Sequence, residues 1–134
     1  MSGIPALKDI LAKKTGLTQG YFPNPETEVT IVSGATEAIF SAVTAVVRKG
    51  DEVLVLEPAY DSYEPAITLN GGIPVYVSLN SGDFSVDWQK VKDAISPKTR
   101  AIMVNSPHNP SGYVWTVEDV NQLADLVEKT GILS

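Results

Sequence analysis

The chain has 134 residues, a length that fits one domain with a sizeable buried core. Hydrophobic residues make up 43% of it and charged residues 19%, a composition typical of a globular protein and not of a disordered one. The formal net charge is −6 and the basic residues are scattered. Because a duplex-binding protein needs Lys and Arg clustered on one face, this charge argues against a nucleic-acid partner.

The residue types that the chain lacks exclude several kinds of chemistry. Cysteine is absent, which rules out disulfides, thiolate catalysis and cysteine-based metal sites within this sequence. His108 is the only histidine, so a site with several histidine ligands is also excluded and no metal is expected. No signal segment and no apolar run of membrane-spanning length is visible. We therefore expect a cytoplasmic protein without a membrane partner.

The predicted elements of the first half alternate between helix and strand. A helical pattern follows residues 1–3 directly, and the run 28–32, rich in β-branched residues, predicts a short strand. A turn at 33–36 leads into a helix over 37–47, which ends before Gly50. Residues 53–56 predict a buried strand, and residues 63–69 predict a helix closed by Asn70, Gly71 and Gly72.

The second half continues the alternation. Residues 73–77 predict a strand, with Pro74 indicating an edge position or a strand start. Asp87 is a good N-cap for a helix to about residue 95, and residues 100–104 predict another strand. The segment from Thr116 to Asp119 resembles a capping box that opens a helix to about residue 129. Residues 131–134 look like the start of a further strand.

This alternation predicts an α/β fold in three layers, α/β/α, with a mostly parallel sheet. The chain stops where the last strand is expected to continue. Because a parallel strand is normally buried on both faces, stopping there would leave an open edge. We therefore expect that the boundary of this chain is drawn through a domain.

The first candidate site segment is the turn Ser33-Gly34-Ala35-Thr36 between a predicted strand and a predicted helix. The N–H groups of a helix start lack intrahelical partners, so this turn is a candidate anion site. Gly34 would let the backbone approach a phosphate closely, and Thr36 carries a hydroxyl donor. The alternative is that Ser33 or Thr36 only caps the helix.

The second segment, residues 57–63, reads Glu-Pro-Ala-Tyr-Asp-Ser-Tyr and directly follows a predicted strand. Ligands of open α/β sheets bind outside the carboxyl ends of the strands, and an aromatic side chain there can stack on a planar ring. Tyr60 and Tyr63 are the candidates. The alternative is that both rings pack on the edge of the sheet with wet hydroxyl groups.

The third segment, residues 105–112, reads Asn-Ser-Pro-His-Asn-Pro-Ser-Gly and follows the next predicted strand of the sheet. Its prolines and glycine predict a rigid turn that holds amide groups at set positions. The Asn109 amide could bind a phenolate oxygen or a carboxylate, although a purely structural turn is the alternative. His108, a lone histidine, is expected to be a surface or turn residue. Since all three segments end predicted strands, we expect them to form one site.

Together the three segments, with Glu37 and Ala38 after the first, resemble fold-type I pyridoxal-phosphate-dependent aminotransferases of class I/II. The similarity runs from about residue 4 to residue 134 and is strongest to the branch of methionine, kynurenine and glutamine aminotransferases. It implies that the backbone of Gly34, Ala35 and Thr36 holds the phosphate of pyridoxal 5′-phosphate. Tyr60 would stack on the pyridine ring. Asn109 would hydrogen-bond the phenolic oxygen of the cofactor beside the substrate carboxylate, with Asn105 in the adjacent wall.

The same resemblance implies that residues 1–134 are a truncated cofactor-binding large domain, without the half that carries the catalytic lysine and without the small domain. The family's Schiff-base lysine lies beyond the asparagine-proline turn, after a strand bearing the aspartate that pairs with the pyridine nitrogen. None of the eight lysines here resembles its motif. We therefore expect no catalytic residue in this chain and no independent transamination.

The parent activity implied by the resemblance moves an amino group between an amino acid and a 2-oxo acid, in a cytoplasmic homo-oligomer whose sites lie at the dimer interface. Three alternatives remain at the level of the sequence. One is a related fold-type I lyase that cleaves carbon–sulfur bonds. Another is a non-catalytic module that binds a phosphorylated ligand. The last is a fragment without any ligand that associates through its open sheet edge.

Overall fold

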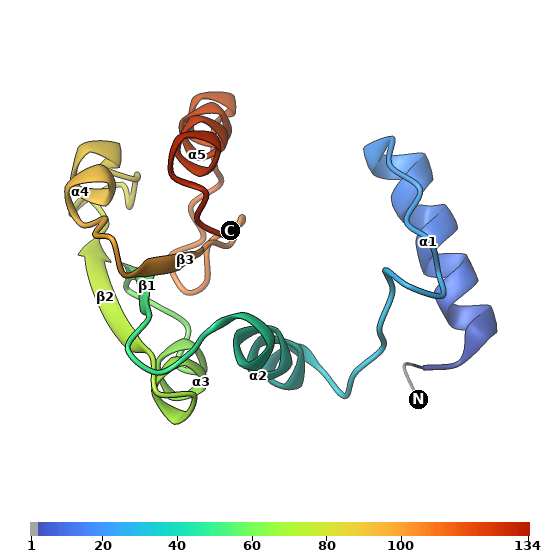
Figure 1. Cartoon of the computed structure of the whole chain (residues 1–134). Helices are drawn as coiled ribbons and strands as arrows, with labels where there is room; N and C mark the ends of the chain where they lie inside the picture. The colour runs from blue at the N-terminus through green and yellow to red at the C-terminus, as the bar shows by residue number, and fades with distance from the viewer. Residues whose placement is uncertain (1–2) are drawn as a thin grey trace. The chain divides into compact units, whose positions relative to one another are not determined.

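The computed structural model describes residues 3–134, which divide into two compact units, one ending at Ala38 and the other spanning Ile39–Ser134. Figure 1 shows the elements in chain order. They are α1 (Pro5–Gln19), α2 (Ala35–Val46), β1 (Glu52–Glu57), α3 (Tyr63–Leu69), β2 (Ile73–Ser78), α4 (Trp88–Asp93), β3 (Thr99–Met103) and α5 (Val117–Thr130). Within residues 3–134, no helix is both long and apolar enough to cross a lipid bilayer.

The first unit is built around one face of α1. Proline occupies the first turn of this helix, and Gly20, with a φ of 75°, ends it in the left-handed conformation. Residues spaced four apart, Lys8, Ala12 and Gly16, form its buried stripe. The ring of Phe22 lies so close to Gly16 that an added Cβ would come within 2.1 Å of it. The helix and the segment that follows it therefore pack through a contact that only glycine allows.

The strand predicted at residues 28–32 is not formed. The structure assigns no strand to these residues, although their β-branched side chains favour an extended backbone. A strand exists only when its N–H and C=O groups pair with a neighbour, and no ladder in the described part of the chain includes these residues. The prediction was wrong because it used local preference without a partner.

The second unit contains a parallel three-stranded sheet in the order β2-β1-β3. All four inner residues of the central strand β1 are buried, which is typical of a strand covered on both faces. Val53 and Val55 pack in a cluster with residues of α2 and α3, whereas Leu54 and Leu56 pack with residues of α4 and α5. The three-layer α/β/α prediction is therefore confirmed (Figure 1).

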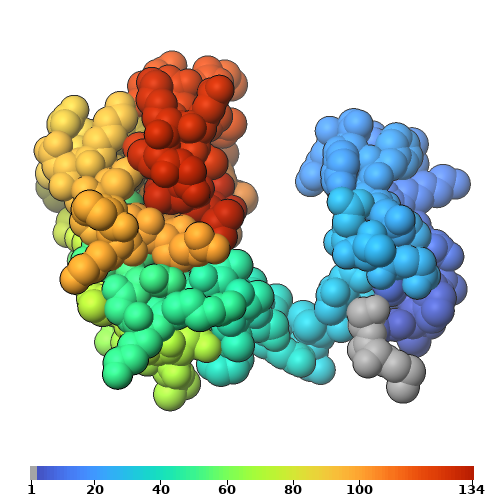
Figure 2. Space-filling view, viewed as in Figure 1, coloured from blue at the N-terminus to red at the C-terminus, as the bar shows by residue number. Residues whose placement is uncertain are grey.

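The layer formed by α4 and α5 lies on the Leu54 and Leu56 side of the sheet. In Figure 2 it appears as a packed mass running from α4 in yellow and orange to α5 in red. Val91 of α4 and Leu126 of α5 belong to the same core cluster, and Val91 has no exposed surface. Trp115, in the loop that precedes α5, also packs against this cluster.

Side-chain caps set the starts of these two helices as the sequence predicts. The carboxylate of Asp87 accepts hydrogen bonds from the N–H groups of Gln89 and Lys90 at the start of α4. At the start of α5, both hydrogen bonds of the capping box between Thr116 and Asp119 are present.

The last residues of the chain begin to pair with the outer edge of β3. Leu133 forms a parallel bridge with Ala101, and its C=O accepts a hydrogen bond from the N–H of Ile102 at 2.8 Å. The N–H of Leu133 donates to the C=O of Arg100 at 3.0 Å. The predicted start of another strand is therefore present as a bridge.

The opposite edge of the sheet is β2, and Pro74 lies in it as predicted. The N–H of Ile73 donates to the C=O of Asp51, and the N–H of Leu79 donates to the C=O of Glu57. The N–H groups of odd-numbered residues along β2 therefore point toward β1. Pro74 occupies the alternate position, where a backbone N–H would point away from β1. It therefore removes one outward donor from an edge that could otherwise pair with another chain.

Replacing Pro74 with valine should increase self-association. The new outward N–H can add one intermolecular hydrogen bond of roughly 0.5–1.5 kcal/mol, which lowers the dissociation constant about threefold to tenfold. Sedimentation velocity over a concentration series measures this change. Pro97→Val, which removes a proline outside the sheet, is the matched control. Equal association of the two variants would contradict a role for Pro74 at the edge.

Candidate functional site

Two of the three segments singled out in the sequence leave the same edge of the sheet. β1 and β3 are neighbouring parallel strands, with Val55 paired to Met103 near their carboxyl ends. The loop bearing Tyr60 follows β1, and the loop bearing Asn105 and Asn109 follows β3. Because parallel neighbours end on the same side, both loops begin at one edge, where ligands of open α/β sheets bind.

The two tyrosines after β1 have different environments. Tyr63 is buried at the start of α3, whereas Tyr60 is half-buried and its ring meets the Tyr63 ring edge-on, with centroids 5.8 Å apart. Burial, together with the nearby Tyr60 hydroxyl, raises the pKa of Tyr63. The structure thus separates the two candidate tyrosines. Tyr63 is a core residue that supports the more exposed Tyr60.

The loop after β3 is a hydrogen-bonded turn. The side-chain oxygen of Asn105 accepts a hydrogen bond from the backbone N–H of Asn109 at 2.7 Å. The backbone N–H of His108 donates to the C=O of Tyr113, and that of Gly112 donates to the C=O of His108, both at 2.7 Å. Asn109 is exposed on this turn, and Asn105 is partly buried beneath it. The predicted rigid turn is present, and Asn105 has a structural contact that the sequence did not predict.

His108 is a buried turn residue. Its side chain is 5% exposed, and its Nδ1 lies 2.8 Å from the hydroxyl oxygen of Ser111. Burial disfavours the charged imidazolium and lowers the pKa of His108. The expectation of a surface or turn residue is met by a turn residue. The burial of the ring was not predicted, because the local sequence does not reveal what packs over it.

The third segment lies at the start of α2 and belongs to the first unit. Gly34 has a φ of 111°, a conformation that L side chains rarely adopt, and no atom lies within 4 Å of where a Cβ would be. Ala35 and Thr36 are exposed in the first turn of the helix. Thr36 is therefore not the N-cap of α2, which excludes the alternative that Thr36 only caps this helix.

Glu37 was not predicted to act at this turn. One of its carboxylate oxygens accepts a hydrogen bond from the backbone N–H of Ser33 at 2.6 Å. A glutamate three residues after the N-cap position is the spacing at which a side chain can reach back over a helix start, so a signal was present in the sequence. This contact holds the chain just before Gly34.

Each of these groups, taken by itself, suits one chemical part of a phosphorylated aromatic cofactor. First-turn N–H groups at a helix start suit a phosphate, a half-exposed tyrosine suits a planar ring, and an exposed amide suits a ring oxygen. Seven of the lysines are exposed and the eighth, Lys8, is buried in α1. No group of three or more metal-binding side chains comes together in the described residues.

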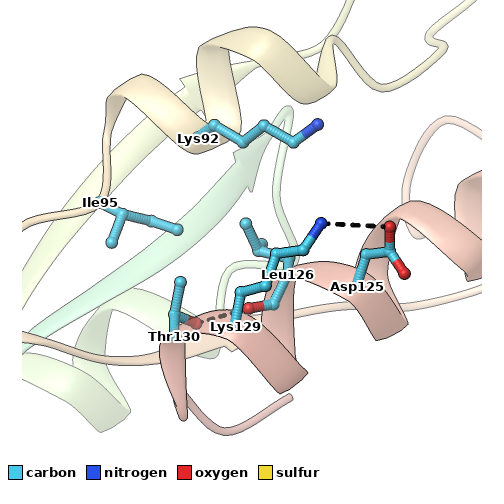
Figure 3. Close-up of a pocket in the computed structure, with 6 residues that line it drawn as sticks. All are labelled: Lys92, Ile95, Asp125, Leu126, Lys129 and Thr130. Atoms are coloured by element: carbon cyan, nitrogen blue, oxygen red, sulfur yellow. Dashed lines mark hydrogen bonds and ion pairs between the residues drawn. The ribbon is translucent and has the colours of Figure 1, made fainter.

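A separate pocket lies between α4 and α5 and contains none of the predicted site residues (Figure 3). Its apolar lining comes from Ile95 and Leu126. Lys129 at its rim pairs with Asp125 at 3.5 Å, and both of these side chains are well exposed. Exposed ion pairs of this kind contribute little to stability. No aromatic side chain that could stack on a ring lines the pocket. We therefore place the candidate site at the strand ends.

Comparison with known proteins gives concordant results. The sequence model of the family described as aminotransferase class I and II matches residues 1–134. A methionine aminotransferase from Escherichia coli is 46% identical over 119 residues, which cover 89% of this chain and 31% of that protein. Kynurenine–oxoglutarate transaminase 1 from Rattus norvegicus is 32% identical over 142 residues, covering 98% and 34%.

The fold agrees with solved structures of the same kind. A crystal structure from Escherichia coli, reported with a methionine aminotransferase function, superposes with a TM-score of 0.95 at 42% identity. The match covers 98% of this chain and 35% of that one. The chain thus spans about a third of the length of the curated relatives that it matches.

The burial of His108 predicts a loss of stability in mild acid. The unfolded chain binds a proton near pH 6.5, whereas the folded chain binds it only at lower pH. The free energy of unfolding should therefore decrease as the pH falls below about 6.5, until the folded-state pKa is reached. Urea unfolding between about pH 7.5 and pH 5.5 measures this effect. A His108→Gln variant should show a flatter profile, and an equally steep one would contradict the assignment to His108.

Proposed function

The chain belongs to the aminotransferase class I and II family, and we propose that it forms the cofactor-cradling part of a pyridoxal-phosphate-dependent aminotransferase. Enzymes of this family use pyridoxal phosphate, which, when bound, supplies the electron sink for moving an amino group. The parent reaction proposed is transfer between an amino acid and a 2-oxo acid. The relatives matched are themselves aminotransferases, which favours this reaction over carbon–sulfur bond cleavage.

The observation that carries the proposal is the parallel pairing of β1 with β3, which starts the Tyr60 loop and the Asn109 loop at one sheet edge. Tyr60 is supported from behind by the buried ring of Tyr63, so it can offer an aromatic surface without collapsing inward. The exposed side chain of Asn109 can donate a hydrogen bond to the cofactor's ring oxygen. Asn105 holds the backbone of Asn109 and lies in the adjacent wall.

The phosphate is assigned to the start of α2. Gly34 has open space where a side chain would project, and the N–H groups of Ala35 and Thr36 belong to the first helical turn. The partial positive charge of the helix N-terminus favours an anion there. The side chain of Glu37 accepts a hydrogen bond from the N–H of Ser33, just before Gly34. We infer that the phosphate occupies the open side above Gly34.

Residues 1–134 are proposed to belong to one cofactor-binding large domain of a cytoplasmic homo-oligomer. Catalysis is assigned to no residue of this chain, because seven lysines are exposed and a lysine that reacts with an aldehyde at neutral pH needs a lowered pKa from burial or neighbouring charge. The buried Lys8 lies in α1, outside the three site segments. We therefore expect no transamination of methionine, the substrate named for the Escherichia coli relative, by the 134-residue chain.

Titration with pyridoxal phosphate, followed by its absorbance, tests the proposed cradle. We expect saturable binding that weakens roughly threefold to tenfold in Tyr60→Ala, from the lost ring contact, and about tenfold in Asn109→Ala, from the lost hydrogen bond.

Two matched controls carry the same side-chain truncations elsewhere in the second unit. Tyr76→Ala changes an exposed tyrosine on β2, and Asn121→Ala changes an exposed asparagine on α5. Both should bind the cofactor as the unaltered chain does. Equal weakening in the controls and the site variants, or the absence of saturable binding, would contradict the proposed cradle.

A further inference from the structure

The side chain of Asp119 accepts more hydrogen bonds than a helix cap requires. Its side chain is 6% exposed. One oxygen accepts from the indole Nε1 of Trp88 at 2.9 Å, and the other accepts from the Tyr113 hydroxyl at 2.9 Å. The second oxygen also accepts from the backbone N–H and the hydroxyl of Thr116, at 2.9 and 2.8 Å. A capping box explains the Thr116 contacts but not those from Trp88 and Tyr113.

The four contacts compensate the burial of a charge. Burial by itself would raise the pKa of Asp119, but hydrogen bonds from Trp88, Thr116 and Tyr113 outweigh it and lower this pKa below its usual value. The carboxylate is therefore ionised at neutral pH, and its bonds are of the stronger, charge-assisted kind. Trp88 lies 31 residues earlier in the chain, so this carboxylate joins α4 to α5.

One arm of the network leads through Tyr113 to the site turn. The C=O of Tyr113 accepts the backbone N–H of His108 at 2.7 Å, and its N–H donates to the hydroxyl of Ser111 at 3.3 Å. His108 immediately precedes Asn109. The hydrogen bond from the Tyr113 hydroxyl to Asp119 thus fixes Tyr113, and the backbone of Tyr113 in turn holds the turn at His108.

The other arm leads through Trp88 to the opposite end of the turn. The Trp88 ring meets the Trp115 ring edge-on, with centroids 5.6 Å apart. The backbone N–H of Trp115 donates to the hydroxyl of Ser106 at 3.0 Å, and Ser106 directly follows Asn105. Asp119 therefore contacts the starting points of both routes that hold residues 105–112.

We propose that Asp119 is a positioning residue for Asn109, holding the cofactor-facing turn through Tyr113 on one side and through Trp88 and Trp115 on the other. The cofactor part of this statement rests on the function proposed above. The simpler alternative is that Asp119 only stabilises the start of α5. The positioning role and the stabilising role differ in which backbone N–H groups lose protection when the carboxylate is removed. If Asp119 holds the turn locally, the turn opens more readily than the core.

Amide hydrogen exchange of the 134-residue chain, read by NMR, separates these alternatives. The reporters are the N–H groups of His108, Asn109 and Gly112, each bonded within the turn, with those of Leu54 and Leu56 in β1 as the core reference. In Asp119→Asn, exchange at the turn should rise about tenfold more than exchange in the core, since a bond to a buried charge is lost. Equal acceleration of turn and core would overturn the proposal.

Thr116→Val is the matched control, because it removes the capping hydroxyl and leaves the Trp88 and Tyr113 contacts in place. Its turn and core amides should change together. Tyr113→Phe, which deletes a single hydroxyl, gives a second test if Asp119→Asn fails to fold. Here too the turn should loosen more than the core, and an unchanged turn would overturn the proposal.

The cofactor part is decided separately by titrating the same variants with pyridoxal phosphate. A loosened turn with about tenfold weaker binding supports both the positioning role and the proposed function. A loosened turn with unchanged binding supports the clamp and contradicts the assignment of Asn109 to the cofactor. Failure of the positioning role and failure of the proposed function therefore give different results.

Discussion

The position of the candidate site depends on the parallel ladder between β1 and β3. β1 is buried on both faces, so its position is fixed by two apolar layers and its direction by two neighbouring strands. Parallel pairing sends the chain out of both strands on the same side. The loops bearing Tyr60 and Asn109 start at one edge for this reason, although these two residues lie 49 positions apart in the chain (109 − 60).

The candidate site side chains of the second unit are held by buried neighbours. Tyr60 is backed by the buried ring of Tyr63, and Asn109 directly follows the buried His108. Asp119, also buried, bonds the residues that hold the turn around Asn109. Each exposed group therefore gains a fixed position from a neighbour that is itself satisfied or packed, which lowers the ordering cost of binding a ligand.

Most of the second unit could be predicted from the sequence because its signals are local. The bounds of α3, the cap at Asp87 and the capping box at Thr116 depend on residues within a few positions of one another. The prediction of a strand at 28–32 was wrong, since strand pairing depends on a distant partner. The bond from Trp88 to Asp119 spans 31 residues and left no local signal. The burial of His108 and of Tyr63 likewise depends on what packs over them.

We propose that the carboxyl ends of β1 and β3 hold the ring of pyridoxal phosphate, and, as a separate proposal, that the first turn of α2 can bind a phosphate. Amide NMR during titration with pyridoxal phosphate, and in parallel with pyridoxal, which lacks the phosphate, tests both proposals most directly. We predict saturable shifts at Ala35, Thr36, Tyr60 and Asn109 with pyridoxal phosphate, and loss of the shifts at Ala35 and Thr36 with pyridoxal. Shifts confined to the pocket between α4 and α5, or identical shifts with both compounds, would contradict the account.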